Sequence, residues 1–416
     1  LSSFVSNFAG FTVVAVVFVA MIGVGVAEGG CLMGALIRRL VAVSPPKALT
    51  LIIVLVGIVS SIATDAGYLI LIPLGGAAFL SVGRHPLAGI AAAFAGVSAA
   101  FAVNLLITPT DGLITEITNE ALQLVDPDSS LDLTANLWFS IASTFFLAVV
   151  ISFVTERMIE PRLGEYHPPA DADEVAEVAG DEERGLRHSL YWTLGAVAAI
   201  TLLTVLPDAP LRHPETGAII GDSPFMSSLI FLITLVLIAA GIGYGRGAGT
   251  YTSSVDVINA ITKAFAGLAG LIFLLLLISQ FIAYFNYSNM PTVAAVALAD
   301  LLEQADIGAI WLLVGLIAVT ALLNIIIPGV VPKWAIFAPV FVPLFMRLDV
   351  APQTVLAAYR IGDAPTNVIT PLMVYLPLIV LTAQRYRRDA GVGTIVSLMI
   401  PYTLVVFVTW TLFFVA

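Results

Sequence analysis

The fold of this chain is decided by a stretch that reads Leu322-Leu-Asn-Ile-Ile-Ile-Pro-Gly-Val-Val-Pro-Lys-Trp334, continues through an apolar run, and ends in Tyr359-Arg-Ile-Gly-Asp-Ala-Pro-Thr-Asn-Val-Ile-Thr-Pro371. Polar and ionisable residues stand here inside apolar sequence, with glycine or proline beside nearly all of them: Asn324, Lys333, Arg360, Asp363, Thr366 and Asn367. Such groups cost free energy in lipid and are usually functional, and irregular backbone at that depth needs shelter by protein or a cavity. The stretch therefore predicts a binding site built from broken membrane helices.

Composition places the whole chain in a membrane. Of 416 residues, 59% are hydrophobic and 11% are charged, and the mean hydropathy is +1.03. A soluble chain of this length does not need that much apolar surface. The excess acid behind the formal charge of -11 is concentrated at 171–183, which we interpret as a solvated loop and not as a nucleic-acid or metal site. One cysteine, Cys31, cannot form an intrachain disulfide.

Apolar segments near the length of about 20 residues that crosses a hydrocarbon core recur along the chain. Two pairs of shorter apolar helices around polar tips predict re-entrant hairpins at 47–81 and 307–346. Proline and glycine interrupt the spans that follow them, at 86–122 and 353–384. The other expected spans are 8–27, 136–155, 189–206, 224–243, 264–303 with an interruption at 284–291, and 393–416, and residues 31–43 are expected to form an interfacial arm.

The order of these segments repeats. Pro73 and Pro86 are separated by the same interval as Pro339 and Pro352, and in that register Tyr68 corresponds to Trp334. An odd number of crossings lies between the two copies, so the copies must be inverted, which is an architecture of secondary transporters. We divide the chain into a first repeat at 1–155, an acidic cytoplasmic loop at 156–188, connecting spans at 189–243 and a second repeat at 244–416. The hairpin tips and helix breaks are expected at Ser60, Ser61, Thr64, Gly67, Pro109, Pro328, Gly329, Pro332, Gly362 and Pro365.

Lysine and arginine placement gives an independent prediction of topology, because short cytoplasmic loops are enriched in them. If the span at 8–27 runs inward, only Arg212 and Arg347 lie outside, and Lys333 and Arg360 lie in the membrane layer. The remaining cations then all face the cytoplasm: Arg38, Arg39, Lys47, Arg84, Arg157, Arg162, Arg184, Arg187, Arg246, Lys263, Arg385, Arg387 and Arg388.

Four strings resemble the AbgT family of p-aminobenzoyl-glutamate transporters. They are Ala63-Thr-Asp-Ala-Gly-Tyr-Leu-Ile-Leu-Ile-Pro-Leu-Gly75, Phe285-Asn-Tyr-Ser-Asn-Met290, Pro332-Lys-Trp-Ala-Ile-Phe-Ala-Pro339 and Tyr359-Arg-Ile-Gly-Asp-Ala-Pro-Thr-Asn-Val-Ile-Thr-Pro-Leu372. The resemblance implies nine spans plus two hairpins in a homodimer of the bacterial inner membrane. Eight spans are visible, so we expect a further span before Leu1. It also implies p-aminobenzoyl-glutamate, p-aminobenzoate or sulfonamide-type antimetabolites as substrates.

The chemistry of such a substrate predicts which residues bind it. A carboxylated aromatic molecule needs hydrogen-bond donors or a cation, and an aromatic face on which its ring can stack. The candidate substrate-binding residues are Trp334, Lys333, Arg360, Asp111, Asn324 and Pro352.

Coupling to an ion gradient needs a second set of groups. Sodium prefers oxygen ligands from side chains and from carbonyls freed at helix breaks. We expect no cofactor, but a sodium ion that is transported with the substrate could bind among Asn104, Asn324, Asp363 and Asn367. Proton coupling would instead use Asp65, Asp111 or Asp363 as the titrating carboxylate. The candidate ion-coupling residues are Asp363, Thr366, Asn367, Asn104, Thr108 and Asp65.

Each candidate also has a purely structural interpretation. Arg360 and Asp363, three positions apart, could form an ion pair that only neutralises itself. Trp334 could be a packing aromatic, and Lys333 could extend towards water. The three asparagines could tie broken backbone to neighbouring helices, and Asp65 and Asp111 could cap the helices that follow them.

Other classes of function remain open. The four histidines and one cysteine form no zinc-site or nucleophile–base pattern, and there is no phosphate-binding loop, so we do not expect an enzyme or a primary pump. An intramembrane enzyme using Asp65 or Asp111 and a passive channel are the alternatives outside transport. Within transport, the alternative is a sodium-coupled importer of dicarboxylates or other small organic anions. We expect lipid and a second copy of the chain, but no nucleic acid, as partners.

Overall fold

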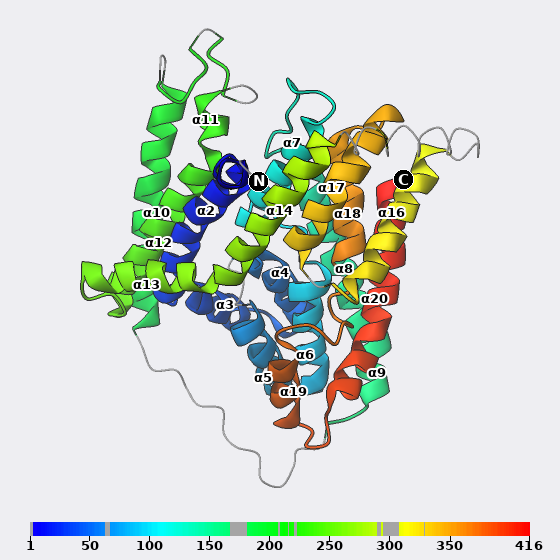
Figure 1. Cartoon of the computed structure of the whole chain (residues 1–416). Coiled ribbons are helices and arrows are strands. Elements are labelled where there is room, and N and C mark those ends of the chain that lie inside the picture. Colours follow the sequence, from blue (N-terminus) through cyan, green and yellow to red (C-terminus); the bar gives the residue numbers. More distant parts are fainter. Residues whose placement is uncertain are drawn as a thin grey trace.

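The computed structural model describes residues 3–62, 67–166, 181–206, 209–214, 216–219, 223–288, 293, 308–327 and 329–416 (Figure 1). Every regular element among these residues is a helix. Six helices are long and apolar enough to cross a membrane, and eight spans result if each of two bent helix pairs is counted as one. The predicted all-helical polytopic fold class is confirmed. Of the predicted residues, Thr64, Asp65, Pro328 and most of the acidic run lie outside the described ranges.

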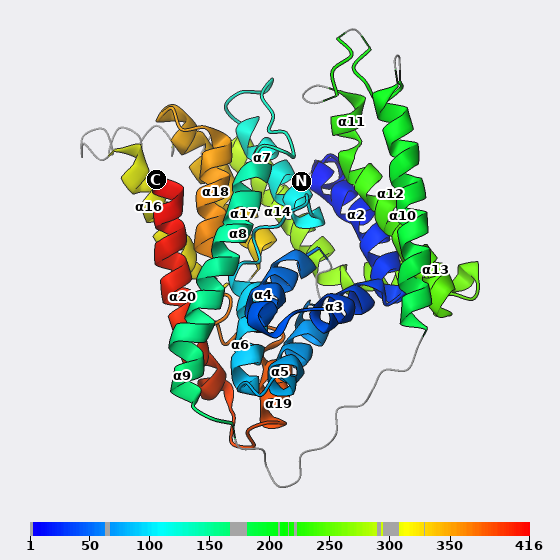
Figure 2. The same cartoon turned by 180° about the vertical axis from the view of Figure 1, so that it is seen from behind.

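One group of helices, which we call the scaffold, stands beside the rest of the molecule (Figures 1 and 2). It consists of α2 (Thr12–Gly29), α10 (Glu182–Val205), α12 (Leu229–Ala248) and α13 (Ser254–Gly267). Small residues let these helices approach closely. A Cβ atom added at Gly23 would lie 2.9 Å from the carbonyl oxygen of Thr234, and one at Gly25 would lie 2.6 Å from the Cβ of Ala264. The short helices α1 (Phe4–Ala9) and α11 (Pro224–Ser227) lie towards the top of Figure 1.

The other group, which we call the core, contains both hairpins and both broken spans. From the first repeat it takes α3 (Leu32–Ala42), η1 (Pro46–Ala48), α4 (Leu49–Ser60), η2 (Gly67–Leu71), α5 (Ile72–Ser81), α6 (Pro86–Phe94), η3 (Ala95–Ala99), α7 (Pro109–Leu122) and α8 (Leu137–Val154). From the second it takes α14 (Ala269–Tyr287), α16 (Ala309–Asn324), α17 (Val330–Arg347), α18 (Pro352–Asp363), α19 (Leu376–Gln384) and α20 (Val392–Val415). Helix continues from α8 into the stretch predicted as the acidic loop, as η4 (Thr155–Ile159) and α9 (Glu160–Leu163).

The two hairpins enter the core from opposite ends (Figure 1). Helices α4 and α5 meet the end near α9 and α19, whereas α16 and α17 descend from the end that carries the chain's C-terminus. The broken spans run in opposite directions past them, α6 and α7 upward and α18 and α19 downward. The backbone thus has the inverted arrangement that the repeated order of segments predicted.

One corner of the core, near α9, is held together by Arg84. Its guanidinium donates to both carboxylate oxygens of Glu160, at 2.9 and 2.6 Å, and to the hydroxyl of Thr50 at 2.8 Å. It also lies 4.1 Å from the ring centroid of Phe79. A bidentate arginine–carboxylate pair is directional, so this contact fixes α4, α5 and α9 relative to one another.

Scaffold and core are joined by a sharp turn at Cys31. This residue is exposed and has a φ of 67°, a left-handed conformation that is uncommon for residues other than glycine. Helix α3 leaves the turn, and its axis makes an angle of 118° with the helix that follows it. Much of α3 is buried against its neighbours, so the predicted interfacial arm is a packed connection.

Three element boundaries differ from the prediction. Helix α17 begins at Val330 and not at 334, because prolines are accepted in the first turn of a helix. Helix α13 was not predicted, because Asp256 and Lys263 lower the hydropathy of a segment that is amphipathic. The chain bends by 47° between α13 and α14, whereas residues 284–287 of the expected interruption are still helical.

Candidate functional site

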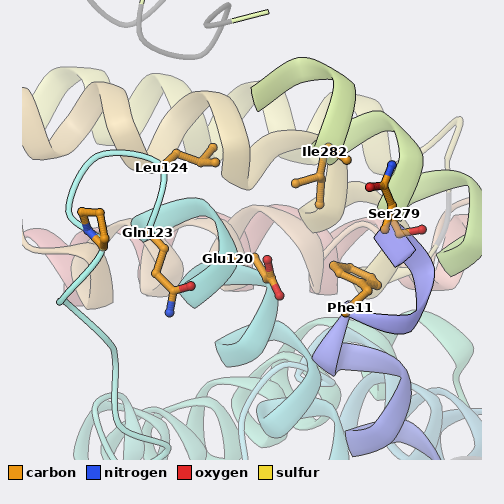
Figure 3. Close-up of a pocket in the computed structure, with 10 residues that line it drawn as sticks. Phe11, Glu120, Gln123, Leu124, Ser279 and Ile282 are labelled. Atoms are coloured by element: carbon orange, nitrogen blue, oxygen red, sulfur yellow. The ribbon is translucent and has the colours of Figure 1, made fainter. Parts of the chain in front are cut away.

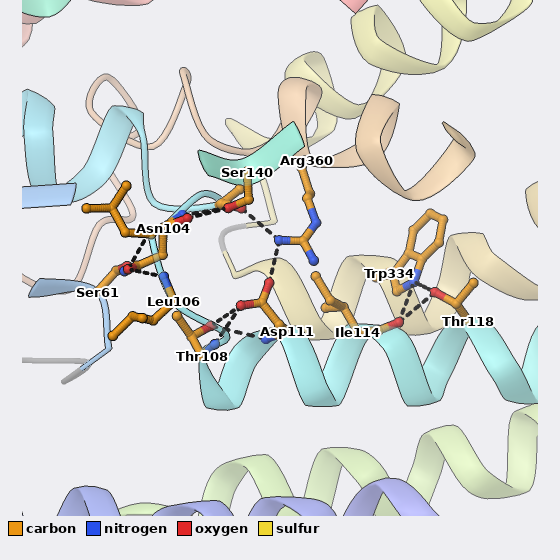
Figure 4. A network of polar contacts seen from close by, with 12 residues as sticks. Ser61, Asn104, Leu106, Thr108, Asp111, Ile114, Thr118, Ser140, Trp334 and Arg360 are labelled. Atoms are coloured by element: carbon orange, nitrogen blue, oxygen red, sulfur yellow. Dashed lines mark hydrogen bonds and ion pairs between the residues drawn. The ribbon is translucent and has the colours of Figure 1, made fainter. Parts of the chain in front are cut away.

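The helix breaks and hairpin tips meet in the middle of the core, where two clusters of polar side chains are buried; Figure 4 shows the first of them. The first cluster surrounds the break between η3 and α7. The second surrounds the break after α18 and the end of α16. The structure therefore brings most of the predicted site residues together, in two groups.

Asn104 ties the first break to the first hairpin. Its Nδ2 donates to the carbonyl oxygens of Ile58 and Val59, both at 3.2 Å, and to the hydroxyl of Ser61 at 3.0 Å. Its Oδ1 accepts the N–H groups of Leu105 at 2.8 Å and Leu106 at 3.2 Å. The side chain thus takes over bonds that a continuous helix would have made.

Thr108 and Asp111 start α7 with a capping box. The Asp111 Oδ2 atom accepts the backbone N–H and the hydroxyl of Thr108, both at 2.7 Å, and the Thr108 hydroxyl accepts the N–H of Asp111 at 3.2 Å. Pro109 is the first residue of α7, where its missing N–H is harmless. Asp111 therefore does take part in a cap, as the structural interpretation supposed, but with one oxygen only.

The other oxygen of Asp111 pairs with Arg360. The Nη1 atom of Arg360 lies 2.6 Å from Oδ1 of Asp111 and donates to the carbonyl oxygen of Ala102 at 2.8 Å (Figure 4). Arg360 is 3% exposed and Asp111 9%. The alternative in which Arg360 pairs with Asp363 is therefore wrong. The arginine reaches across to the first repeat and joins the two repeats.

One edge of the Arg360 guanidinium is free of hydrogen bonds to the described residues. Its Nε is buried and has no partner, and its bonds to Asp111 and Ala102 both use Nη1. The Nε–Nη2 edge of a guanidinium presents two parallel donors that match the two oxygens of a carboxylate. This edge is the clearest unused recognition element in the described part of the core.

The second cluster is centred on an ion pair between Lys333 and Asp363. The Nζ of Lys333 lies 2.6 Å from Oδ1 of Asp363, with each side chain 1% exposed. Lys333 also donates to Oδ1 of Asn324. The amide of Asn324 donates to the carbonyl oxygen of Asp363 at 2.6 Å, to the Thr366 hydroxyl at 2.9 Å and to Oδ1 of Asn367 at 2.8 Å. Lys333 therefore points inward and does not extend towards water.

Asp363 keeps one oxygen without a partner. Its Oδ2 is buried and accepts no hydrogen bond from the described residues, and the buried hydroxyls of Ser98 and Thr320 have no partner either. Ser98 is close to the cluster, since its carbonyl oxygen accepts from Asn367 at 3.4 Å. Oxygen atoms with unused lone pairs are what a sodium ion would need. Of the four predicted sodium ligands, Asp363 is the one that keeps an unused oxygen. The Asn367 oxygen accepts from Asn324 and the Asn324 oxygen accepts from Lys333, whereas Asn104 lies in the other cluster.

Trp334 is completely buried between the two repeats. Its indole N–H donates to the Thr118 hydroxyl at 2.8 Å and to the carbonyl oxygen of Ile114 at 3.2 Å, and its ring stacks on Tyr359 with centroids 4.4 Å apart. The corresponding aromatic of the first repeat, Tyr68, stacks on Tyr375 at 4.3 Å. The role of Trp334 in substrate stacking stays a prediction, since Tyr359 covers one face of its ring.

Most of the remaining predicted residues shape the backbone. Gly329 has a φ of 101°, a value that favours glycine, and a Cβ at Gly67 would lie 2.4 Å from the Ser60 hydroxyl. The Pro365 carbonyl accepts from Thr403 at 2.9 Å, and Pro332 lies in the first turn of α17. Pro352 is the first residue of α18, about 12 Å along the helix from Arg360, so the structure does not bring it to either cluster.

The sequence did not single out Thr118, Tyr359, Ser98 or Ser140. The Ser140 hydroxyl donates to the carbonyl oxygen of Asn104 at 2.8 Å, and the Tyr359 hydroxyl donates to that of Val330 at 2.5 Å. Only Tyr359 carried a signal, because it directly precedes Arg360 in the motif. Single hydroxyls in apolar helices are common and usually bond to their own backbone.

A separate cavity of about 390 Å³ lies between α1, α7 and α14 (Figure 3). The carboxylate of Glu120 and the side chains of Gln123 and Ser279 line it, together with the ring of Phe11. None of the predicted site residues is among its lining residues. The cavity is therefore not part of either cluster.

We expect Gly362→Ala to destabilise the core. A Cβ at this position would lie 2.5 Å from the carbonyl oxygen of Ile317 and 2.6 Å from the Cβ of Thr320, and overpacking of this kind costs roughly 1–3 kcal/mol. The midpoint of thermal unfolding in mild detergent should fall. Gly315→Ala on α16 is the matched control, because nothing lies within 4 Å of its Cβ position. Equal midpoints for the two variants would contradict the close packing of α18 on α16.

We expect Trp334→Ala to lower stability strongly, because removing a buried aromatic side chain costs about 3–5 kcal/mol. Trp334→Phe keeps a ring against Tyr359 and loses only the bonds to Thr118 and Ile114, worth roughly 0.5–1.5 kcal/mol each. Unfolding midpoints should therefore fall in the order wild type, Trp334→Phe, Trp334→Ala. Substrate affinity measured on Trp334→Phe tests stacking without the loss of packing. An unchanged midpoint for Trp334→Ala would show that the indole does not support the core.

Comparisons with known proteins agree on one family. A family model described as AbgT putative transporter family matches residues 1–416. The p-aminobenzoyl-glutamate transport protein of Escherichia coli (strain K12) is 33% identical over 417 residues, which cover 100% of this chain and 82% of that protein.

Two solved structures are closely similar. The YdaH transporter of Alcanivorax borkumensis, whose structure is described as revealing an unusual topology, has a TM-score of 0.94 at 39% identity, covering 99% of this chain and 86% of that one. MtrF of Neisseria gonorrhoeae, described as illuminating a class of antimetabolite efflux pumps, has a TM-score of 0.92 at 39% identity, covering 100% and 83%.

Proposed function

This chain belongs to the AbgT family of transporters, and on that premise we propose that it is a gradient-driven secondary transporter of p-aminobenzoyl-glutamate and p-aminobenzoate-type compounds that also exports sulfonamide antimetabolites. The named relatives support this substrate class, since one is a p-aminobenzoyl-glutamate transport protein and another represents antimetabolite efflux pumps. The observation in the chain itself that carries the proposal is the free edge of Arg360.

Arg360 would hold the substrate carboxylate through that edge. Its Nη1 remains bonded to Asp111 and Ala102, which keeps the plane of the guanidinium fixed. The carboxylate would then bind to donors that are already oriented, and little side-chain entropy would be lost. The stacked pair of Trp334 and Tyr359 lies on neighbouring helices, and Tyr359 directly precedes Arg360 in α18. The aromatic ring of a substrate bound at Arg360 would therefore lie in the same part of the core as Trp334 and Tyr359.

The charge of the site supports coupling to a cation. The four buried ionisable groups of the two clusters, Lys333, Arg360, Asp111 and Asp363, form two ion pairs and sum to zero. A carboxylate substrate adds one negative charge, and an uncompensated charge is costly in a low dielectric. A cation that enters with the substrate restores neutrality. The free Oδ2 of Asp363 would accept either a sodium ion or a proton.

We also propose that two copies form a homodimer through the scaffold. Helix α10 is the least buried of the candidate spans, with 11% of its most apolar window buried inside the chain. Its exposed residues include Leu190, Tyr191 and Leu194, and a partner subunit would cover part of this surface. A monomeric mass in mild detergent, together with full activity, would contradict the dimer.

The test of function is flux of radiolabelled p-aminobenzoate in proteoliposomes, with the sodium and proton gradients collapsed separately. We expect saturable flux that one of the two gradients drives and that unlabelled sulfonamide inhibits. Arg39→Gln, at an exposed position on α3, is the control for the general effect of removing an arginine. Transport of succinate without transport of p-aminobenzoate would favour the dicarboxylate importer instead. Flux that neither saturates nor depends on a gradient would indicate a channel.

A further inference from the structure

An apolar groove of about 520 Å³ separates the scaffold from the core. The core side is formed by Ile62 at the first hairpin tip, by the first break and by the start of α8, and the scaffold side by α10 and α12. Its lining residues are Ile62, Leu105, Leu106, Ile107, Leu137, Val197, Ile200, Thr201, Thr204, Val205, Phe225, Leu229, Leu232, Ile233, Val236 and Leu237. The volume lies within the range of about 300–1,000 Å³ that is usual for small-molecule sites.

The side chains that line the groove offer no free polar group to a ligand. The hydroxyls of its two threonines are used by their own helix, Thr201 donating to the Val197 carbonyl at 2.8 Å and Thr204 to the Ile200 carbonyl at 2.7 Å. Every other lining side chain is a hydrocarbon. An occupant must therefore be apolar along its whole buried length.

The groove lies in the exterior half of the membrane layer. It takes the last turns of α10 and the first turns of α12, which meet at the end of the scaffold that carries α11 (Figure 1). From Val197 to Val205 it extends roughly 12 Å along α10, and half of a hydrocarbon core is roughly 15 Å thick. Val205 is 58% exposed and Val197 44%, so the groove is open along α10. Its dimensions and depth suit one acyl chain.

Two backbone N–H groups of the first break have partners at the point where the break lines the groove. Leu106 is 61% exposed, which is unusual for a leucine beside a cluster of buried polar groups. The N–H groups of Leu105 and Leu106 both donate to Oδ1 of Asn104. Lipid is tolerated beside irregular backbone only when the polar groups of that backbone have partners.

A cation stands at the exterior mouth of the groove. Phe225, a lining residue, donates its N–H to the carbonyl oxygen of Leu211 at 2.9 Å, which places the neighbouring Arg212 at the rim. The Nε of Arg212 is buried without a partner, and the side chain forms no ion pair with the described residues. Arg212 and Arg347 are the two cations predicted to face the exterior, and a guanidinium matches a phosphate in shape and charge.

We propose that this groove binds an outer-leaflet phospholipid, with one acyl chain against Leu106 and the phosphate held by Arg212. The lipid then fills the space between scaffold and core and packs directly on the first break. It is a structural ligand at a position that neither of the polar clusters occupies. The proposal does not depend on which solute is transported.

Lipid binding is measured by native mass spectrometry of the purified full chain titrated with dioleoylphosphatidylglycerol. Ile200→Trp places a larger side chain in the groove, and we expect it to weaken binding of the tightest lipid at least tenfold. Arg212→Gln should remove the preference for this anionic lipid over uncharged dioleoylglycerol. Leu202→Trp is the control, because Leu202 is 58% exposed on α10 but does not line the groove. Equal lipid binding by Ile200→Trp and Leu202→Trp would overturn the proposal.

A photo-crosslinking amino acid at Val197 gives a second measurement, one that does not depend on blocking the groove with a larger side chain. After irradiation in native membranes, we expect a covalent phospholipid adduct on the intact chain. A crosslinked dimer in place of the adduct would assign the groove to a second copy of the chain. Absence of both products, with crosslinking intact at Leu202, would also exclude the lipid.

Discussion

Arg360→Lys is expected to weaken binding of p-aminobenzoate at least tenfold while the protein still folds. Lysine keeps the positive charge beside Asp111 but cannot present the pair of donors that the Nε–Nη2 edge offers. Hydrogen bonds to charged groups contribute about 1.5–3 kcal/mol each, so loss of one such bond weakens binding roughly tenfold to a hundredfold. Equilibrium binding of radiolabelled p-aminobenzoate to the purified variant measures the effect directly.

Two further variants separate binding from folding. Arg360→Ala leaves Asp111 buried without its partner, which costs about 3–5 kcal/mol, so a loss of binding in that variant is ambiguous. Arg39→Lys on α3 is the matched control, because Arg39 is exposed and lies outside both clusters. If Arg360→Lys binds substrate with wild-type affinity and an unchanged unfolding midpoint, the free edge is not the carboxylate site.

Asp363→Ala should abolish transport and also destabilise the protein. The substitution leaves the charge of Lys333 buried at 1% exposure without its carboxylate, and breaking such a pair from one side costs about 3–5 kcal/mol. Asp363→Asn keeps the shape and removes only the charge, so it should fold better and still fail to couple transport to the ion gradient. Proteoliposome flux at several sodium concentrations and pH values measures that loss.

The double variant Lys333→Met with Asp363→Asn distinguishes a structural ion pair from a functional one. Removing both charges together avoids the unpaired group and should return most of the stability, because apolar replacement of a buried pair is often neutral. Transport should not return with it. If Asp363→Asn alone transports with the same sodium and pH dependence as the wild type, ion coupling does not pass through this carboxylate.

The arrangement of helices was predictable because few backbone structures can satisfy their hydrogen bonds inside a lipid bilayer. Runs of apolar residues interrupted by Pro109, Gly329 or Gly362 leave little choice but broken spans and hairpins, and these are where the structure has them. Composition could not predict α13. Its apolar residues occupy one face only, and Asp256 and Lys263 lower the mean hydropathy of the segment. Its position against α2 depends on packing at Gly25 and Gly29, which a hydropathy profile does not detect.

The members of the site were predictable, but their partners were not. Buried charge in apolar sequence identified Lys333, Arg360, Asp111 and Asp363 individually. Spacing along one helix favoured a pair between Arg360 and Asp363, whereas Arg360 bonds to a residue 249 positions away. Contacts between repeats depend on how the inverted copies interlock, and no local pattern encodes that.

The turn at Cys31 makes the protein convenient to observe in motion. The chain has one cysteine, and this cysteine is exposed and free at the joint where α2 of the scaffold passes into α3 of the core. A fluorophore or spin label can therefore be attached there without removing other thiols. Its signal would report any rotation of the core against the scaffold during a transport cycle, with the native residue as the only attachment point.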